Sequence, residues 1–121
     1  MSSQPFKQSP ADLLVHEFAQ ERASALGRLG RALEAALAAL AAFDGDAAGA
    51  SAPAPDHRQR RNALVAQASV ALWHFVVQRE ACGMRDVRQV LRDYRVPPEV
   101  AARMGMLPTE PPRLRRPNRG T

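Results

Sequence analysis

Apolar residues recur at helical spacing through the first third of the chain. The row consists of Leu14, Phe18, Ala25, Leu26, Leu29, Leu33, Ala36 or Leu37, Leu40 and Phe43. From Leu26 onward its intervals alternate between three and four residues, the heptad spacing of a helix that packs along another helix. The row is preceded by a typical helix start, in which Ser9 supplies a capping hydroxyl, Pro10 the first turn and Asp12 an acid. This pattern predicts one helix over about residues 10–43.

A second row of similar spacing follows after an interruption. It consists of Val65, Ala68, Leu72, Phe75 or Val76, Arg79 and Cys82. Asp56 lies three residues before Gln59, as in a capping box, and Gly83 is suited to ending the helix because glycine accepts a left-handed backbone. A helix is therefore predicted over about residues 57–82. Around residues 72–77 its apolar arc is so wide that two neighbouring elements are needed to cover it.

The remaining segments separate or follow these helices. Residues 44–55 are rich in alanine, glycine and proline, which predicts a flexible linker that permits an antiparallel hairpin. A capping pattern at Asp86 predicts a short helix over about residues 87–93. Two consecutive prolines then restart the chain as a last short helix over about residues 98–104, which is expected to stop at Gly105.

These elements predict an all-α fold, in which a long antiparallel helical hairpin carries two short C-terminal helices. Hydrophobic residues make up 45 % of the chain and aromatic residues 5 %, a balance that favours helices packed through alanine and leucine. One domain is expected over residues 10–105, between disordered tails at 1–9 and 106–121. Because two helices leave part of the wide arc uncovered, we expect the hairpins of two copies to pair as a homodimeric four-helix bundle.

The net charge of +5 belongs largely to the C-terminal tail. Four of the 17 basic residues lie between Arg113 and Thr121, and the other 13 nearly balance the 12 acidic residues. The tail arginines are Arg113, Arg115, Arg116 and Arg119. They are candidate contacts for a polyanion, such as nucleic acid, an acidic lipid surface or an acidic protein. The alternative is a solvated terminus, because four charges give only weak, salt-sensitive binding.

The sequence offers little catalytic or metal-binding chemistry. His16 and Glu17 resemble part of the zinc-protease helix motif, but Gln20 stands where the second histidine ligand belongs. The single cysteine, Cys82, excludes an internal disulfide, fits a reducing cytoplasm and falls on the apolar row, where an inert thiol is expected. No catalytic residue, metal ligand or cofactor is predicted, and no stretch is long and apolar enough to predict a transmembrane helix.

Charged residues crowd the corner between the second long helix and the two short helices. This set comprises Arg79, Glu80, Arg85, Arg92, Asp93, Tyr94 and Arg95. Arg79 occupies a core position of the apolar row, so it is expected to pair with Glu80 or Asp93. Two interpretations stay open for the set: an ion-pair network that holds the helices together, or an interaction surface for a protein or an anion.

The same corner carries a family resemblance. Residues 78–86, with the sequence QREACGMRD, and residues 91–105, which contain the sequence DYRVP, resemble a domain-of-unknown-function family of small helical proteobacterial proteins. Residues 20–28 are similar to that family as well, and the resemblance spans about residues 11–105. It implies a helical protein with no known activity, so no catalytic or binding residue is carried over.

These observations favour a non-enzymatic protein-binding or assembly module whose partner is a second copy or another protein. The alternative is a nucleic-acid-binding protein, in which residues 86–104 act as a helix-turn-helix-like unit beside the basic tail. The turn of that unit has no glycine, and its last helix offers only Glu99 and Arg103 as long polar side chains to base edges.

Overall fold

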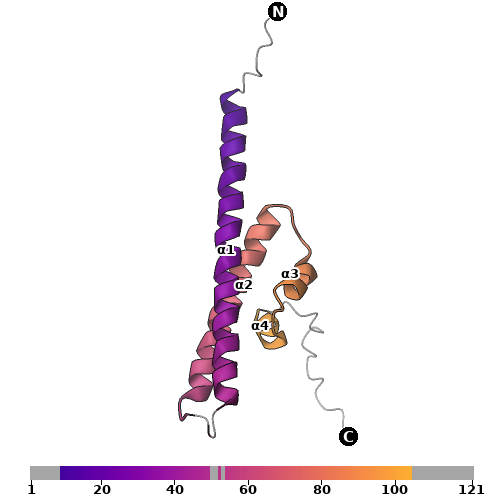
Figure 1. Cartoon of the computed structure of the whole chain (residues 1–121). Coiled ribbons are helices and arrows are strands. Elements are labelled where there is room, and N and C mark those ends of the chain that lie inside the picture. Colours follow the sequence, from indigo (N-terminus) through magenta and orange to yellow (C-terminus); the bar gives the residue numbers. More distant parts are fainter. Residues whose placement is uncertain (1–8, 50–51, 53, 105–121) are drawn as a thin grey trace, which may run out of the picture.

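Four helices make up the described part of the chain, which comprises residues 9–49, 52 and 54–104 of a computed structural model. They are α1 (Pro10–Ala48), α2 (His57–Ala81), α3 (Val87–Asp93) and α4 (Pro98–Arg103). The two long helices form an antiparallel hairpin, and the two short ones lie beside α2 (Figure 1). The described residues contain no strand, so the predicted all-α fold, with two long helices followed by two short ones, is confirmed. The predicted tails and Gly105 lie outside the described residues, except for Ser9.

All three predicted helix starts are confirmed, and two of the three predicted side-chain caps are present. Ser9 and Asp12 form a capping box, because each side chain accepts a hydrogen bond from the backbone N–H of the other at 3.1 and 3.3 Å. The carboxylate of Asp86 accepts a hydrogen bond from the backbone N–H of Gln89 at 3.3 Å. The capping box predicted at Asp56 is wrong, since its side chain makes no capping bond. Its backbone lies at φ −96° and ψ 8°, whereas side-chain caps need an extended residue.

The end of α2 follows the prediction closely. Gly83 adopts a left-handed backbone with φ 86°, which costs glycine little because it has no Cβ. Its N–H donates to the carbonyl of Glu80 at 2.9 Å, and the N–H of Met84 donates to the carbonyl of Arg79 at 2.8 Å. This pair of hydrogen bonds is a Schellman motif, which satisfies the last carbonyls of the helix and turns the chain toward α3.

The first helix is longer than predicted, because α1 continues to Ala48 instead of stopping near residue 43. The first five residues of the predicted linker 44–55 are therefore helical. Tertiary contacts hold this extra turn: the ring of Phe43 stacks on that of His57 at 4.8 Å, and the Asp44 carboxylate binds Arg61. Such contacts outweigh the low helix propensity of the glycine in this segment.

The core lies where α2 is covered by α1 and by the short helices together. Its buried members are Leu33, Leu40, Val65, Ala68, Leu72, Phe75, Val90 and Val100. The wide apolar arc around residues 72–77 is therefore divided: Leu72 and Phe75 are buried, whereas Trp73 and Val77 are exposed. The short helices supply part of the second neighbour that the arc requires.

Gly30 permits the closest approach in this core. A Cβ at this position would lie 3.0 Å from the hydroxyl oxygen of Tyr94 and 3.3 Å from the ring of Phe75. These two rings meet edge to face, with their centroids 5.1 Å apart. The small residue on α1 thus makes room for the end of α3.

The N-terminal part of α1 is unpacked. Every residue from 10 to 24, a segment that we name the arm, is exposed. In Figure 1 the arm continues the line of α1 beyond the end of α2. Leu14 and Phe18 on it are 51 % and 60 % exposed, although the sequence pattern places both in the apolar row. In the part of the chain that the structure describes, no helix is both long and apolar enough to cross a membrane.

Candidate protein-interaction surface

A row of apolar side chains lies on the face of α2 that its buried residues leave uncovered. It consists of Ala66, Val70, Trp73 and Val77, and we name it the outer row of α2. The intervals of four, three and four residues repeat the heptad spacing of the buried row. The side chains of Val70, Trp73 and Val77 are 51 %, 48 % and 44 % exposed. This outer row is therefore a second packing face on a helix whose first face is already covered.

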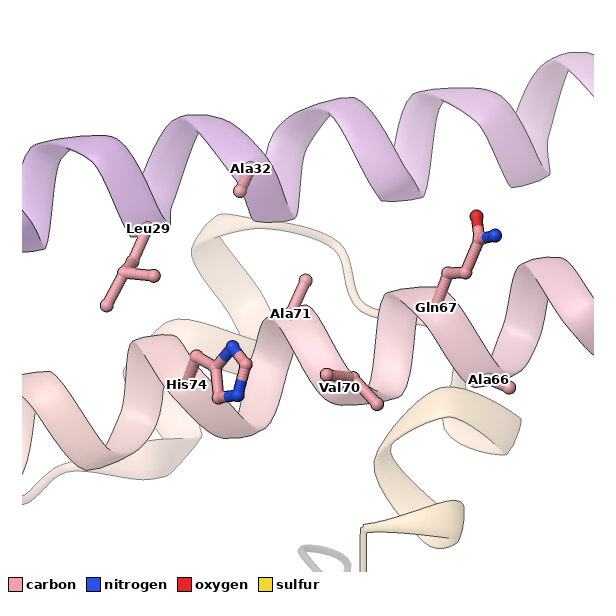
Figure 2. Close-up of a pocket in the computed structure, with 7 residues that line it drawn as sticks. All are labelled: Leu29, Ala32, Ala66, Gln67, Val70, Ala71 and His74. Carbon is pink, nitrogen blue, oxygen red and sulfur yellow. The ribbon is translucent and has the colours of Figure 1, made fainter.

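A shallow groove of about 380 Å³ lies between the two long helices next to this row (Figure 2). Its walls are formed by Leu29, Ala32, Ala66, Gln67, Val70, Ala71 and His74. Leu29 and Ala32 come from α1, and the other five residues come from α2. Polar groups among the lining residues are restricted to Gln67 and His74, both of them exposed. The groove offers an apolar floor with two polar side chains at its edge.

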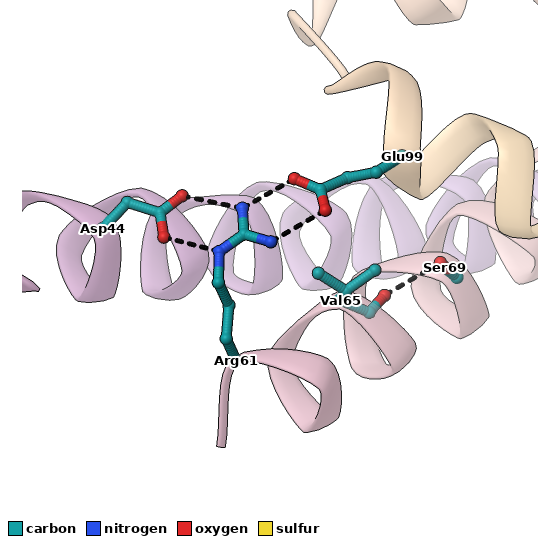
Figure 3. A network of polar contacts seen from close by, with 5 residues as sticks. All are labelled: Asp44, Arg61, Val65, Ser69 and Glu99. Carbon is teal, nitrogen blue, oxygen red and sulfur yellow. Dashed lines mark hydrogen bonds and ion pairs between the residues drawn. The ribbon is translucent and has the colours of Figure 1, made fainter. Parts of the chain in front are cut away.

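The strongest polar contact joins three helices and was not predicted from the sequence (Figure 3). The Arg61 guanidinium on α2 donates to both carboxylate oxygens of Asp44 on α1, from Nε at 2.8 Å and from Nη2 at 3.0 Å. It also donates to both oxygens of Glu99 on α4, from Nη1 at 2.7 Å and from Nη2 at 2.6 Å. We name these residues the Arg61 cluster.

Electrostatics in the Arg61 cluster favour the charged form of every member. Hydrogen bonds from Arg61 hold the pKa of the Asp44 and Glu99 carboxyls below their usual values. The two carboxylates in turn raise the pKa of Arg61, because they accept its hydrogen bonds, with Glu99 contributing more than Asp44. Bidentate pairs of this kind are directional as well as strong. Because both carboxylates are engaged by the same guanidinium, the cluster fastens α4 to the hairpin and presents no free ligand site.

The predicted charged corner contains no such network. Arg79 is half-buried, but it makes no ion pair with Glu80 or Asp93, so that prediction is wrong. Its guanidinium lies 5.8 Å from the centroid of the Phe75 ring, where an aromatic face replaces the expected carboxylate. The exposed members of the set are Glu80, Arg85, Arg92, Asp93 and Arg95. The interpretation of this set as an interaction surface stays a prediction.

Tyr94 also belongs to that set, but its side chain is half-buried and packs against the core. Its ring packs on Phe75, and burial raises the pKa of its phenol. The next residue, Arg95, has φ 50°, a left-handed backbone that is unusual for a residue with a side chain. The N–H groups of Arg95 and Val96 close the end of α3 by donating to the carbonyls of Arg92 and Leu91.

Comparison with known proteins gives one assignment. The model of a family of unknown function, DUF6665, matches residues 7–112. The chain belongs to DUF6665. This result confirms the resemblance to a domain-of-unknown-function family, and the match extends on both sides of the expected range 11–105. Comparisons of the chain with curated proteins and with solved structures give no match.

Membership of DUF6665 assigns no chemistry. Among the described residues no three His, Cys, Asp or Glu side chains gather as a metal site would require. His16 and Glu17 lie on the exposed arm. Cys82 is half-buried beside Gln78, whose Nε2 lies 4.0 Å from its sulfur. The buried hydroxyl of Ser69 lies 2.8 Å from the carbonyl oxygen of Val65 and 3.2 Å from that of Val100, so its single proton is shared between α2 and α4.

Helix α4 of this DUF6665 chain has little to offer to a base edge. α4 has only six residues, and two of them, Val100 and Ala101, are buried. Glu99 is engaged by Arg61, which leaves Arg103 as the long polar side chain of this helix. The tail arginines 113, 115, 116 and 119 lie outside the described residues, so the nucleic-acid alternative stays a prediction.

Proposed function

We propose that this protein is a non-enzymatic assembly module that joins protein chains through the apolar helix faces of its hairpin. The observation that supports the proposal best is the outer row of α2. Three large apolar side chains, Val70, Trp73 and Val77, are about half exposed although the hairpin is already formed. Apolar side chains gathered on one exposed face are typical of protein interaction sites.

The occupant that fits the outer row is another helix. Heptad spacing places successive side chains along one line, where they can enter the gaps between the side chains of an apposed helix. Trp73 lies within the row, and buried tryptophans contribute more than most residues to protein interfaces. The groove beside Val70 widens the apolar surface toward Leu29 and Ala32 of α1.

Self-association is part of this proposal. Two copies would supply four long helices, and a homodimeric four-helix bundle would cover apolar side chains that the single hairpin leaves exposed. We place this assembly in the cytoplasm, in agreement with a single cysteine that cannot form an internal disulfide.

The proposal is tested first by size-exclusion chromatography with light scattering. We expect a mass near twice the 13.2 kDa of one chain at micromolar concentration. Binding of other proteins is tested by affinity purification from native cells with wild type, Trp73→Glu and the matched control Gln59→Glu. Gln59 is an exposed residue of the same helix outside the row. The proposal is contradicted if the wild-type protein is monomeric and if wild type, Trp73→Glu and Gln59→Glu all purify with the same proteins.

Nucleic-acid binding is the alternative, and a gel shift separates it from the assembly proposal. A basic tail of four arginines would bind polyanions at low salt and release them as salt rises. The assembly proposal expects no shift of DNA or RNA even at about 50 mM salt. A shift that persists to about 200 mM salt would favour the alternative.

A further inference from the structure

We propose that the arm of α1 packs antiparallel on α1 of a second copy and enters the groove between its α1 and α2. This inference rests on the self-association proposed above, but it assigns the second copy to α1. The outer row of α2 then stays available to a different protein. The supporting observations are two apolar rows on α1 and a separation of charge along it.

The first row of α1 faces α2, and its members are Leu26, Gly30, Leu33, Leu37 and Leu40. The second row starts in the arm and includes positions one residue before those of the first. Its members are Ala11, Val15, Phe18, Arg22, Ala25, Leu29, Ala32 and Ala36. Both rows alternate intervals of three and four residues, as expected for a helix with two helical neighbours.

Within the described part of the chain, α2 covers the first row of α1, but no helix covers the arm part of the second row. Val15 and Phe18 of the second row are 64 % and 60 % exposed, and no described residue covers them. The same row reaches Leu29 and Ala32, which form the α1 wall of the groove. The second row therefore joins an uncovered arm to an open apolar groove along a single helix.

A two-fold axis near residues 23 and 24 brings arm and groove together. When Phe18 lies opposite Leu29 of the second copy, Val15 falls opposite Ala32, and the symmetry repeats both contacts. Arg22 then lies opposite Ala25, whose short side chain leaves room for the guanidinium to reach water. The overlap from residue 11 to residue 36 is about 38 Å long at the rise of an α-helix. Each half of such a dimer contains α1, α2 and the arm of the other copy.

Charge complementarity selects a second copy in this orientation. Glu17 and Glu21 are like charges four residues apart on the arm, and Arg28 and Arg31 are like charges three residues apart beyond it. Such neighbours repel each other on an isolated helix. All four side chains are exposed, and none of them has an ion pair within the described part of the chain.

Antiparallel pairing turns this repulsion into attraction. With the register above, Glu21 lies beside Arg28 of the second copy. The two-fold axis repeats this contact, so two opposite-charge pairs flank the apolar rows, and Glu17 and Arg31 add acidic and basic charge further out on the same side. A parallel pair in register would instead place one acidic arm beside the other.

Charge reversal in the full-length protein tests this arrangement by sedimentation at low ionic strength. Glu21→Arg and Arg28→Glu each create two like-charge contacts, so each should raise the dimer dissociation constant about tenfold. The double variant Glu21→Arg/Arg28→Glu should return it to within about threefold of wild type. Glu34→Arg makes the same charge change on an exposed site of α1 outside the second row, and it should leave the constant unchanged.

Mixing the two single variants gives the most direct readout. Glu21→Arg protein is basic at both positions and Arg28→Glu protein is acidic at both, so an equimolar mixture should dimerise at concentrations where each variant alone is mostly monomeric. Circular dichroism checks that every variant keeps its helices. Dimerisation that responds to Glu21→Arg no more than to Glu34→Arg, or a mixture that stays monomeric, overturns the inference. A dimer that Trp73→Glu dissociates and the charge reversals leave intact overturns the arm contact but keeps the proposed function.

Discussion

The two parts of α1 share one unbroken helix, yet only one of them is packed. From Leu26 onward, residues at alternating intervals of three and four lie against α2, and Leu33 and Leu40 are fully buried. In the arm the apolar residues Leu14, Val15 and Phe18 remain exposed. Periodicity states which face of a helix is apolar, whereas the length of the neighbouring helix decides which part of that face is covered. The comparison thus separates residues that stabilise the single chain from residues available to a partner.

The largest contrast is expected between two leucines of this helix. Leu33→Ala removes a fully buried side chain and should lower the free energy of unfolding by about 2–5 kcal/mol. Leu14→Ala removes the same atoms from the arm and should change it by less than about 0.5 kcal/mol. Urea unfolding of dilute protein measures both, because dilution limits any contribution of a second copy. Equal losses would mean that the arm is packed within the single chain.

Gly27 and Gly30 of α1 differ in how closely other parts of the chain approach them. Gly30→Ala places a methyl group 3.0 Å from the hydroxyl of Tyr94, and this overpacking should cost about 1–3 kcal/mol. A methyl group at Gly27 meets only the flexible end of Arg31 at 3.3 Å. Gly27→Ala should therefore stabilise the protein by up to about 1 kcal/mol through helix propensity. Thermal unfolding of the two variants should show shifts of opposite sign, and a stabilising Gly30→Ala would contradict the close packing.

The Arg61 cluster should contribute less to the free energy of unfolding than the buried side chains of the packed part of α1. Arg61→Gln removes four hydrogen bonds to Asp44 and Glu99, and we expect a loss of about 1–2 kcal/mol, because the pairs are bidentate but partly exposed. The matched control is Arg58→Gln. Arg58 is exposed on the same helix, makes no ion pair among the described residues and should contribute less than about 0.5 kcal/mol. If urea unfolding shows equal losses of unfolding free energy in Arg61→Gln and in the control, the cluster stabilises the fold no more than an exposed arginine does.

Acid should lower the contribution of the Arg61 cluster to the free energy of unfolding. The pKa values of Asp44 and Glu99 are lower in the folded chain than in the unfolded one, because Arg61 binds their ionised forms. Their contribution is therefore complete above the unfolded pKa values near pH 4 and is lost as pH falls through the lower folded values. Unfolding measured from pH 7 to pH 3 should show the difference between wild type and Arg61→Gln shrink below about pH 4. A difference that grows toward acid would contradict this sign.

Much of the fold could be predicted because its signals are local. Ser9 and Asp86 cap the backbone three residues on, and Gly83 adopts the left-handed backbone that ends α2. Each of these depends on a few neighbouring residues, so the spacing in the sequence is sufficient. Asp56 has the same spacing as Asp86 but not the extended backbone that capping needs, and spacing alone does not reveal that difference.

The candidate site was harder to predict because its determinants are distant in sequence. Arg61 meets partners 17 and 38 residues away, and no local pattern links them. Arg79 was placed at a core position with a carboxylate partner, but the ring of Phe75 one turn earlier faces its charge instead. The outer row of α2 could be found as a wide apolar arc, yet which side of it the short helices cover depends on how Ser69 and the Arg61 cluster hold α4.

The unbroken course of α1 also fixes a rotational phase between the arm and the core. A straight helix turns about 100° per residue, so Phe18 and Leu33 keep a set angle about the same axis. Inserting one residue between them would swing the arm row toward another side of the molecule, whereas inserting seven would restore its direction to within about 20°. The number of residues between the arm and the core therefore sets the direction in which the apolar row of the arm points relative to the hairpin.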